Sequence, residues 1–242
     1  MSVQKEIYAL KRELAARYQL GEEHHNICGR KIGVTCVEDA EALFDKLGMA
    51  DPDSIEVQDE RLPYWATLWD SALILSDVLL SDNLIAPGES VLELGCGLGL
   101  VSSIACLKRA RVTATDYQPD ALKFARLNSL QIAGVAPRTM LIDWRFPPQG
   151  QHYATLLGAD LVYELRFFDP LIAAFDAFLA PGGRILFSEP HRVVGRSFFD
   201  RLLDAGWAFS TITEREGATV YEIVRGEGAS HKDTKTPQRY KT

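Results

Sequence analysis

The chain has 242 residues, of which 47% are hydrophobic and 24% are charged, as expected for one globular α/β domain with at most a small appendage. Its formal net charge of -7 argues against a general nucleic-acid-binding protein, because neutralising phosphates requires a basic face. No run reaches the roughly 18 apolar residues of a membrane helix, and the first residues do not resemble a signal peptide, so we expect no membrane association and a cytoplasmic location.

The N-terminal residues 1–62 are predicted to form a small cap on a larger domain. Apolar residues at three- and four-residue steps indicate an amphipathic helix over residues 3–19. The segment 27–37 alternates in character and predicts a hairpin, and 39–48 predicts a short helix that ends at a glycine. A segment of this length is too short to bury an independent core comfortably.

Metal binding is not expected. None of the cysteines belongs to a CxxC pair, so the sequence predicts neither a redox motif nor a common zinc framework: Cys28, Cys36, Cys96 and Cys106. His24, His25 and Cys28 are close together but would need a remote fourth ligand. We interpret this stretch as a polar loop before a strand.

From residue 63 onward the pattern predicts a helix and then strands and helices in alternation. The predicted strands are 90–95, 111–116, 139–144, 155–164 and 184–190, and the predicted helices between or after them are 98–110, 119–134, 165–180 and 195–206. Two β-rich runs around Gly217 predict a C-terminal antiparallel hairpin.

This alternation predicts an α/β fold with a doubly wound, mostly parallel seven-stranded sheet, because strand–helix–strand units form parallel sheets with right-handed crossovers. We assign residues 63–225 to this domain, with the antiparallel hairpin at its C-terminal end. Residues 226–242 have almost no apolar side chains and predict a disordered tail.

The stretch VLELGCGLGL (91–100) places Gly95, Gly97 and Gly99 directly after a buried strand. The dinucleotide pattern G-x-G-x-x-G requires a glycine at position 100, where this chain has Leu100. No Gly-Lys-Ser/Thr of a P-loop follows either. The turn therefore predicts a nucleotide-type ligand but argues against a dehydrogenase.

Acidic residues near this turn indicate what the ligand carries. Asp116 ends the second predicted strand, where a carboxylate can accept both hydroxyls of a ribose, although it could also only cap a helix. Glu93, below the turn, suits a ligand with positive charge. At the next strand end, Asp143 can accept from an adenine amino group and Trp144 offers an apolar ring face. All of these positions lie at carboxyl ends of parallel strands, where open α/β sheets bind ligands.

The pattern E-x-G-x-G-x-G, followed by an acid and then Asp-Trp, resembles the class I S-adenosylmethionine-dependent methyltransferases. The segments VLELGCGLGLVSSIA, VTATD, LIDW and GADLVYE recur in this order in the family 16, or seven-β-strand, lysine methyltransferases, and their D-x-x-Y motif is present as Asp160 to Tyr163. The resemblance covers roughly residues 63–225. It implies S-adenosylmethionine as cofactor, with contacts from Trp69, Gly95, Cys96, Gly97, Asp116, Trp144 and Ala159.

The same resemblance implies a protein substrate that presents a lysine, with Asp160 and Tyr163 lining its entrance as catalytic residues. Asp160 would orient the incoming ammonium, and the Tyr163 hydroxyl would hydrogen-bond the amine. Both could instead be a strand-end acid and a packed aromatic. The glycine and acid motifs concern the cofactor alone, so a small molecule, another side chain such as arginine, or a catalytically silent cofactor-binding protein remain alternatives.

Two further segments lie near the predicted site but are not assigned to it. Tyr64 and Trp65 are interpreted as packing of the cap against the sheet. In the segment SEPHR, Glu189 and His191 fall at a strand tip on the ligand edge, but the sequence identifies no partner for a histidine base there.

Overall fold

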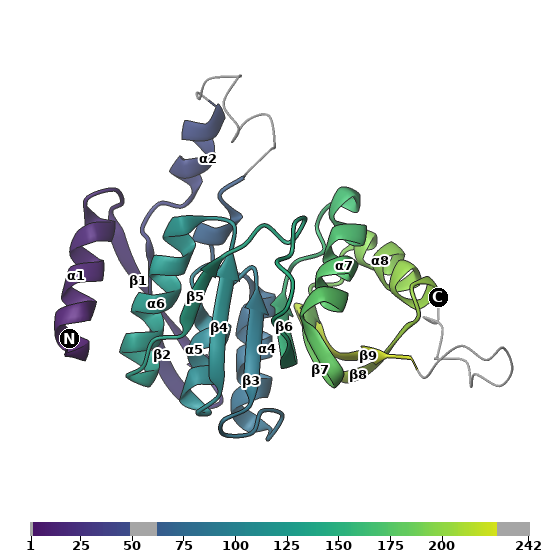
Figure 1. Ribbon diagram of the computed structural model, residues 1–242. Coiled ribbons are helices and arrows are strands. Elements are labelled where there is room, and N and C mark those ends of the chain that lie inside the picture. Colours follow the sequence, from purple (N-terminus) through teal and green to yellow (C-terminus); the bar gives the residue numbers. More distant parts are fainter. Residues whose placement is uncertain (1, 49–61, 227–242) are drawn as a thin grey trace, which may run out of the picture.

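A seven-stranded sheet forms the centre of the molecule, and its strands lie in the order β5-β4-β3-β6-β7-β9-β8 (Figure 1). The computed structural model describes residues 2–48 and 62–226. The strands are β3 (Ser90–Leu94), β4 (Arg111–Asp116), β5 (Arg138–Leu141), β6 (Tyr153–Ala159), β7 (Leu179–Glu189), β8 (Trp207–Arg215) and β9 (Ala218–Arg225). Strands β3 to β7 pair in parallel, and β9 pairs antiparallel with both β7 and β8. The predicted mostly parallel sheet with a C-terminal antiparallel hairpin is confirmed.

Helices cover both faces of the sheet. One face carries α4 (Asp70–Ser81), α5 (Leu100–Leu107) and α6 (Pro119–Ala133), and the other carries α7 (Phe168–Phe178) and α8 (Val193–Asp204). Successive strand residues contribute to opposite cores: Val91 packs with the first group and Leu92 with the second. Both are fully buried, as the near-continuous apolar strands of a doubly wound sheet require.

Several predicted boundaries were wrong near the carboxyl edge. Strand β6 ends at Ala159, five residues before the predicted end, because Asp160 has a left-handed φ of 56° that turns the chain away from the sheet. A 3-10 turn, η2 (Leu165–Phe167), precedes α7. Strand β5 ends at Leu141, and residues 142–152, all within the described part, connect it to β6 without a helix.

The N-terminal cap contains α1 (Val3–Ala15), β1 (Leu20–Ile27), β2 (Arg30–Val37) and α2 (Glu41–Gly48). The hairpin is longer than predicted, since β1 pairs with β2 from Leu20 onward. His24 and His25 therefore lie on a strand and not in a loop. The polar, exposed character of β1 hides its strand pattern, because neither of its faces is continuously apolar.

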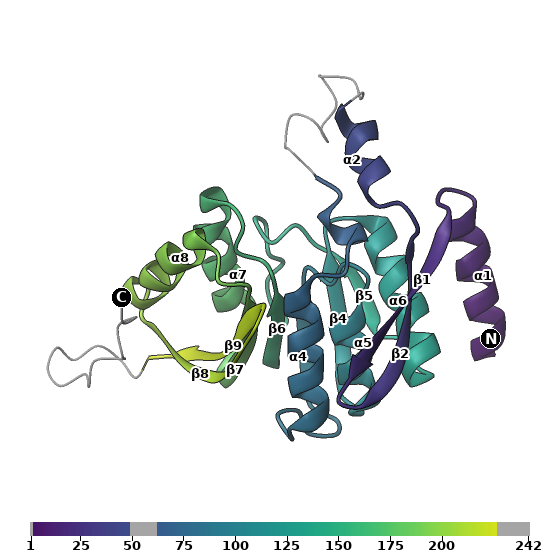
Figure 2. The ribbon, with the colours of Figure 1, turned by 180° about the vertical axis from the view of Figure 1, so that it is seen from behind.

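The cap is tied to the sheet domain through α6 and lies beside α4 and α6 in the reverse view (Figure 2). Asn128 of α6 is fully buried, and its side chain accepts from the backbone N–H of Thr35 at 2.8 Å. The Asn128 amide also donates to the carbonyls of Thr35 and Leu98 at 2.9 and 2.8 Å. One side chain thus joins the cap to the end of the glycine turn.

The predicted C-terminal tail lies outside the described residues, except for Gly226, whose N–H donates to the Gly206 carbonyl. Within residues 2–48 and 62–226, no helix combines the length and the apolar character needed to cross a membrane.

Candidate active site

One cavity opens at the carboxyl ends of β3, β4 and β6, where the strand order reverses. It contains every predicted site residue except Gly99: Trp69, Glu93, Gly95, Cys96, Gly97, Asp116, Asp143, Trp144, Ala159, Asp160 and Tyr163. The structure therefore brings these residues together at one edge of the sheet. The individual roles assigned to them remain predictions.

The first two glycines line the cavity, and neighbouring groups leave no room for a side chain at either position. Gly95 and Gly97 have φ values of 62° and 49°, which disfavour residues with a side chain. A Cβ on Gly97 would lie 3.1 Å from the Trp65 carbonyl oxygen, and one on Gly95 would lie 2.7 Å from Leu161 Cδ2. The turn consequently exposes backbone to the cavity.

Gly99 has a different task. It precedes α5 with a φ of 78°, and a Cβ there would lie 2.3 Å from Ala125 Cα on α6. The third glycine therefore allows two helices to approach each other, and it does not line the cavity. Sequence spacing alone grouped it with the ligand-facing glycines.

Asp116 joins the tip of β4 to the glycine turn. Its Oδ2 accepts from the Gly97 N–H at 3.0 Å, and its Oδ1 accepts from the Gln118 N–H at 2.9 Å. Burial raises the pKa of Asp116 to about 6, against the opposing effect of these backbone hydrogen bonds. The side chain is therefore ionised at neutral pH and presents fixed acceptors to the cavity.

Glu93 and Cys96 lie deeper and are more strongly perturbed. Glu93 Oε2 accepts from the Ser102 N–H at 2.9 Å and from the Ser102 hydroxyl, which ties it to α5. Burial raises the pKa of Glu93 to about 8, so its charge is sensitive to any cation placed in the cavity. Burial, and then the carboxylates of Asp116 and Glu93, raise the pKa of the Cys96 thiol well above its usual value.

Asp143 and Trp144 form the cavity wall beyond β5. Arg145 pairs with Asp143 through Nε to Oδ1 at 2.9 Å and Nη2 to Oδ2 at 2.6 Å. The Arg145 backbone N–H also donates to Oδ1 at 3.0 Å, and Nε is shared with Oδ2 at 3.0 Å, so Arg145 already occupies both carboxylate oxygens. The contact of Asp143 with an adenine amino group remains a prediction. The Trp144 ring lies edge-on to Phe167, with 6.2 Å between ring centroids.

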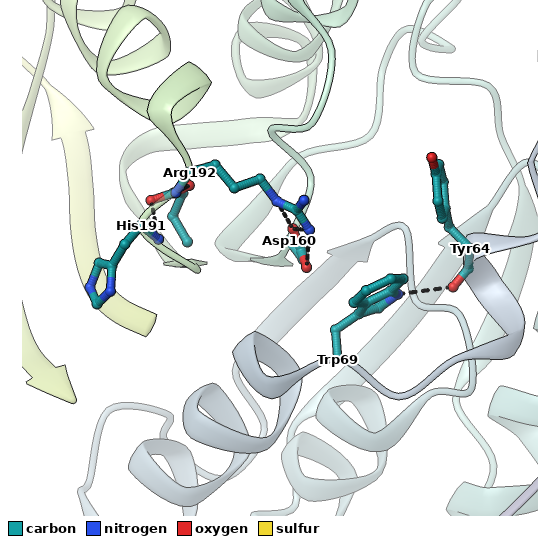
Figure 3. Close-up of polar contacts among 6 residues, drawn as sticks. Tyr64, Trp69, Asp160, His191 and Arg192 are labelled. Carbon is teal, nitrogen blue, oxygen red and sulfur yellow. Dashed lines mark hydrogen bonds and ion pairs between the residues drawn. The ribbon is translucent and has the colours of Figure 1, made fainter. Parts of the chain in front are cut away.

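Aromatic side chains surround the opposite side of the cavity and are here called the aromatic collar: Tyr64, Trp69, Tyr163 and Phe167. The ring centroids of Tyr64 and Tyr163 are 5.3 Å apart, those of Tyr163 and Phe167 are 5.6 Å apart, and those of Tyr64 and Trp69 are 6.0 Å apart. The Trp69 indole also donates to the Tyr64 carbonyl at 3.0 Å (Figure 3).

Two members of the collar were not predicted from the sequence to line the cavity. Tyr64, in the turn η1 (Tyr64–Ala66), does pack against the cap as predicted, with its ring centroid 5.7 Å from that of Phe44 in α2, but it also lines the cavity. Phe167 carries no local signal at all. Burial raises the pKa of Tyr163, so its phenol is a neutral donor throughout the physiological range.

Asp160 is held by an arginine from the next loop (Figure 3). Arg192 Nε lies 3.0 Å from Asp160 Oδ1, and Arg192 Nη2 lies 2.9 Å from Oδ2, which is a bidentate ion pair. The Asp160 side chain is 6% exposed and that of Arg192 is 38% exposed. The Arg192 guanidinium carbon also lies 5.9 Å from the centroid of the Trp69 ring. Nothing in the sequence linked these two residues.

The segment after β7 is built to hold that arginine. The Glu189 carboxylate accepts from the N–H groups of His191 and Arg192 at 2.9 and 2.8 Å. His191, with a φ of 60°, places its Nε2 2.7 Å from the Thr219 hydroxyl on β9. A Cβ on Gly195 would lie 2.6 Å from a Glu189 oxygen, so α8 begins directly against this carboxylate. The sequence identified no partner for His191. In the structure its partner is the Thr219 hydroxyl, and this contact holds the segment after β7 against β9.

The cavity fits an adenosyl sulfonium better than a metal. Among the described residues, no cluster of three or more His, Cys, Asp and Glu side chains could hold a metal ion. Asp116 offers fixed acceptors for a diol, the collar offers ring faces to a cation, and Glu93 is a buried acid that a positive charge would ionise. The strand order, the glycine turn and the acid that follows define a class I S-adenosylmethionine-dependent methyltransferase.

Comparison with known proteins places the chain more closely. The profile of a family described as lysine methyltransferase matches residues 51–205, and the chain belongs to this family. It is 34% identical over 154 residues to EEF1A lysine methyltransferase 3 of Mus musculus, covering 59% of this chain and 64% of that protein. It is 33% identical over 132 residues to protein N-lysine methyltransferase METTL21A of Xenopus tropicalis, covering 50% and 60%.

The chain thus spans less than two thirds of the length of these curated relatives. The fold is also that of magnesium protoporphyrin IX methyltransferase from Synechocystis PCC 6803, solved with bound S-adenosylmethionine. That structure has a TM-score of 0.51 and 19% identity, with 79% of this chain and 99% of that chain covered. A likeness of this size concerns the fold and not the acceptor.

Proposed function

We propose that the protein transfers a methyl group from S-adenosylmethionine to the side-chain amine of a lysine in a protein substrate. The observation that carries the proposal is the arrangement of one cavity: Asp116 ends β4 on one side of β3, and Asp160 and Tyr163 follow β6 on the other side of β3. Family membership and the names of the two relatives support a lysine acceptor.

Cofactor binding is assigned to the side formed by β3 and β4. Asp116 would accept the ribose hydroxyls, the backbone at Gly95 and Gly97 would approach the amino-acid part, and Trp144 and Asp143 would face the adenine. The bound cofactor supplies an electrophilic methyl group on a positively charged sulfur. Its charge favours the ionised form of Glu93, so binding would release a proton from that buried acid near neutral pH.

Acceptor chemistry is assigned to the collar side. A lysine amine has a reference pKa of about 10.4 and must be neutral to attack. The collar excludes water and disfavours the ammonium form, while its ring faces tolerate the methylated cation that leaves. The neutral phenol of Tyr163 would hydrogen-bond the amine and fix its direction, which gives the in-line approach that displacement at carbon requires.

A labelling experiment tests the acceptor. The full-length protein is incubated with cell extract and S-adenosylmethionine carrying a labelled methyl group, with S-adenosylhomocysteine as competitor in the control. We expect label in a protein band and, after acid hydrolysis, in methylated lysine. Label confined to methylarginine or to the small-molecule fraction would contradict the lysine assignment, and no incorporation at all would favour a silent cofactor-binding protein.

We also propose a cytoplasmic location and a protein, not a nucleic acid, as partner. The net charge of -7 supports the choice of partner, since a nucleic-acid surface would need a basic face. Fractionation of cells, followed by immunodetection, checks the location.

A further inference from the structure

Arg192, in the segment after β7, pairs with Asp160 and lies 5.9 Å from the ring centroid of Trp69, and both of these residues line the mouth of the cavity. We infer that Arg192 is a positioning residue that promotes the neutral form of the acceptor amine, because its guanidinium neutralises Asp160 and holds a fixed positive charge at the mouth. The inference rests on the proposed function, since it concerns the lysine that the cavity receives. It refines the hypothesis that Asp160 alone receives the ammonium.

Arg192 is held both at its guanidinium and at its backbone. Its fork pairs with both oxygens of Asp160, at 3.0 and 2.9 Å. Its own backbone N–H donates to Glu189, and the neighbouring His191 is anchored to Thr219 on β9. The pair therefore joins the ends of β6 and β7 across 32 positions of sequence, and Asp160 adds a further link through its N–H to the Ser188 carbonyl. A residue held in this way keeps its charge in one place.

Without Arg192, the charges around the mouth of the cavity would favour the protonated form of the acceptor lysine. The titratable and charged groups around Arg192, Tyr163 and the cavity are Tyr64, Asp116, Tyr117, Asp160, Glu164, Glu189 and His191, together with Arg145 and Arg166, which already pair with Asp143 and Glu164. Most of those that carry charge are carboxylates, and a carboxylate stabilises a nearby ammonium. Asp160, 6% exposed, would do so strongly if it stood alone. The hydrogen-bonded Asp160 raises the pKa of Arg192 further, so the opposing cation is permanent.

Loss of the ammonium proton is the step that this arrangement assists. A fixed guanidinium near an ammonium repels it and lowers its pKa, and the proton leaves to solvent through the open mouth. The lysine Nζ lone pair then forms the new N–C bond while the C–S bond breaks, and the electron pair of that bond returns to sulfur. Asp160 keeps one lone-pair site on each oxygen, so it still accepts a hydrogen bond from the neutral amine.

Opposite substitutions in the ion pair provide the test. The dependence of kcat on pH, which reports the pKa of groups in the enzyme–substrate complex, is measured from neutral pH to about pH 10. Cofactor and acceptor protein, the latter purified after labelling, are both saturating. Arg192→Gln leaves Asp160 unopposed and shifts the profile to higher pH by about one unit, a loss of about tenfold at neutral pH. Asp160→Asn leaves Arg192 unopposed and shifts the profile to lower pH. The double variant returns close to the wild-type profile.

Controls separate charge from structure. Arg192→Lys keeps the charge but loses the fork, so we expect a lower rate with an unshifted profile. Arg201→Gln removes a bidentate partner of Asp169 on the surface, away from the cavity, and leaves the profile unchanged. A merely structural ion pair predicts that both single variants lose activity without shifting the profile, or shift it in the same direction. Either result overturns the inference. Thermal melting identifies a variant that fails to fold, and Asp160→Asn alone then carries the test.

The two levels of the proposal fail in different ways. If the wild-type protein labels no lysine, the proposed function is wrong and the inference falls with it. If the wild-type protein methylates lysine but the profiles of Arg192→Gln and Asp160→Asn coincide with its own, only the inference is wrong.

Discussion

The two sides of the cavity are built by different means. On the proposed cofactor side, Asp116 accepts hydrogen bonds from Gly97 and Gln118, and Glu93 from Ser102, all within 19 positions of sequence. On the proposed acceptor side, Asp160 pairs with a residue 32 positions away, and the aromatic collar contains rings from both before and after the glycine turn in the sequence.

This difference follows from what each side must bind. A cofactor of constant structure is held by a compact motif, in which neighbouring backbone groups fix the side chains. An acceptor side assembled from separate loops can change one loop without disturbing the glycine turn. Substrate choice within the family is therefore expected to depend on the segments after β6 and β7 and before α4.

The largest effect on cofactor affinity is expected from substitution of Asp116. Asp116→Ala removes a charged acceptor of two predicted ribose hydrogen bonds and leaves the Gly97 N–H without its partner. At roughly 1.5–3 kcal/mol for each hydrogen bond to a charged group, affinity should fall by about a hundredfold or more. Titration calorimetry with S-adenosylhomocysteine measures it, with the exposed Asp169→Ala as control. Unchanged affinity would contradict the assignment of Asp116 to cofactor binding.

The next prediction separates backbone strain from packing within the glycine turn. Gly99 and Gly134 have φ values of 78° and 73°, but only Gly99 has a neighbour, Ala125, in the space of a new Cβ. Gly134→Ala should lower the free energy of unfolding by about 1 kcal/mol, and Gly99→Ala by about 3 kcal/mol. Urea denaturation compares the two. Equal losses would show that the approach of α5 to α6 tolerates the methyl group.

A smaller effect is expected on the acceptor side. Tyr163→Phe should leave the affinity for S-adenosylhomocysteine unchanged and lower methyl transfer by about tenfold, because one hydrogen bond to the amine is lost. Steady-state rates and calorimetry on the same preparation measure both quantities, with the exposed Tyr8→Phe as control. Lost cofactor binding would move Tyr163 to the cofactor side and sharpen the boundary between the two.

The smallest effect concerns Glu93 and appears only as a dependence on pH. Its folded-state pKa of about 8 exceeds its ordinary value of 4.5, so the folded protein holds this proton more tightly than the unfolded chain. The free energy of unfolding should therefore fall as pH rises from 4.5 to about 8. Glu93→Gln removes this slope and should raise Tm by a few degrees at pH 8 but not at pH 5. Parallel slopes in melting curves would contradict a buried acid.

The sheet could be predicted from the sequence because buried parallel strands leave a strong apolar pattern. Strand β6 was predicted too long because Leu161 and Val162 are buried in the core beside α7 without belonging to a strand. The first half of the β1–β2 hairpin was not predicted. Apolar content reports burial, and it reports strand structure only when the two coincide.

The same limit applies to the site. Asp116 was identifiable as a site residue because it ends a predicted strand at the ligand-binding edge of the sheet. Tyr64 and Arg192 were not, since their partners are distant in sequence and no local spacing predicts them. Gly99 fitted the pattern of its neighbours, yet its close contact is with a helix.

The buried thiol of Cys96 has a consequence for side reactions in the cavity. A thiolate is a far better nucleophile than a thiol, and this sulfur borders the cavity proposed to hold the methyl donor. Burial, and then the neighbouring carboxylates, raise the pKa of the thiol, so this side chain would be a poor acceptor for the methyl group of that donor.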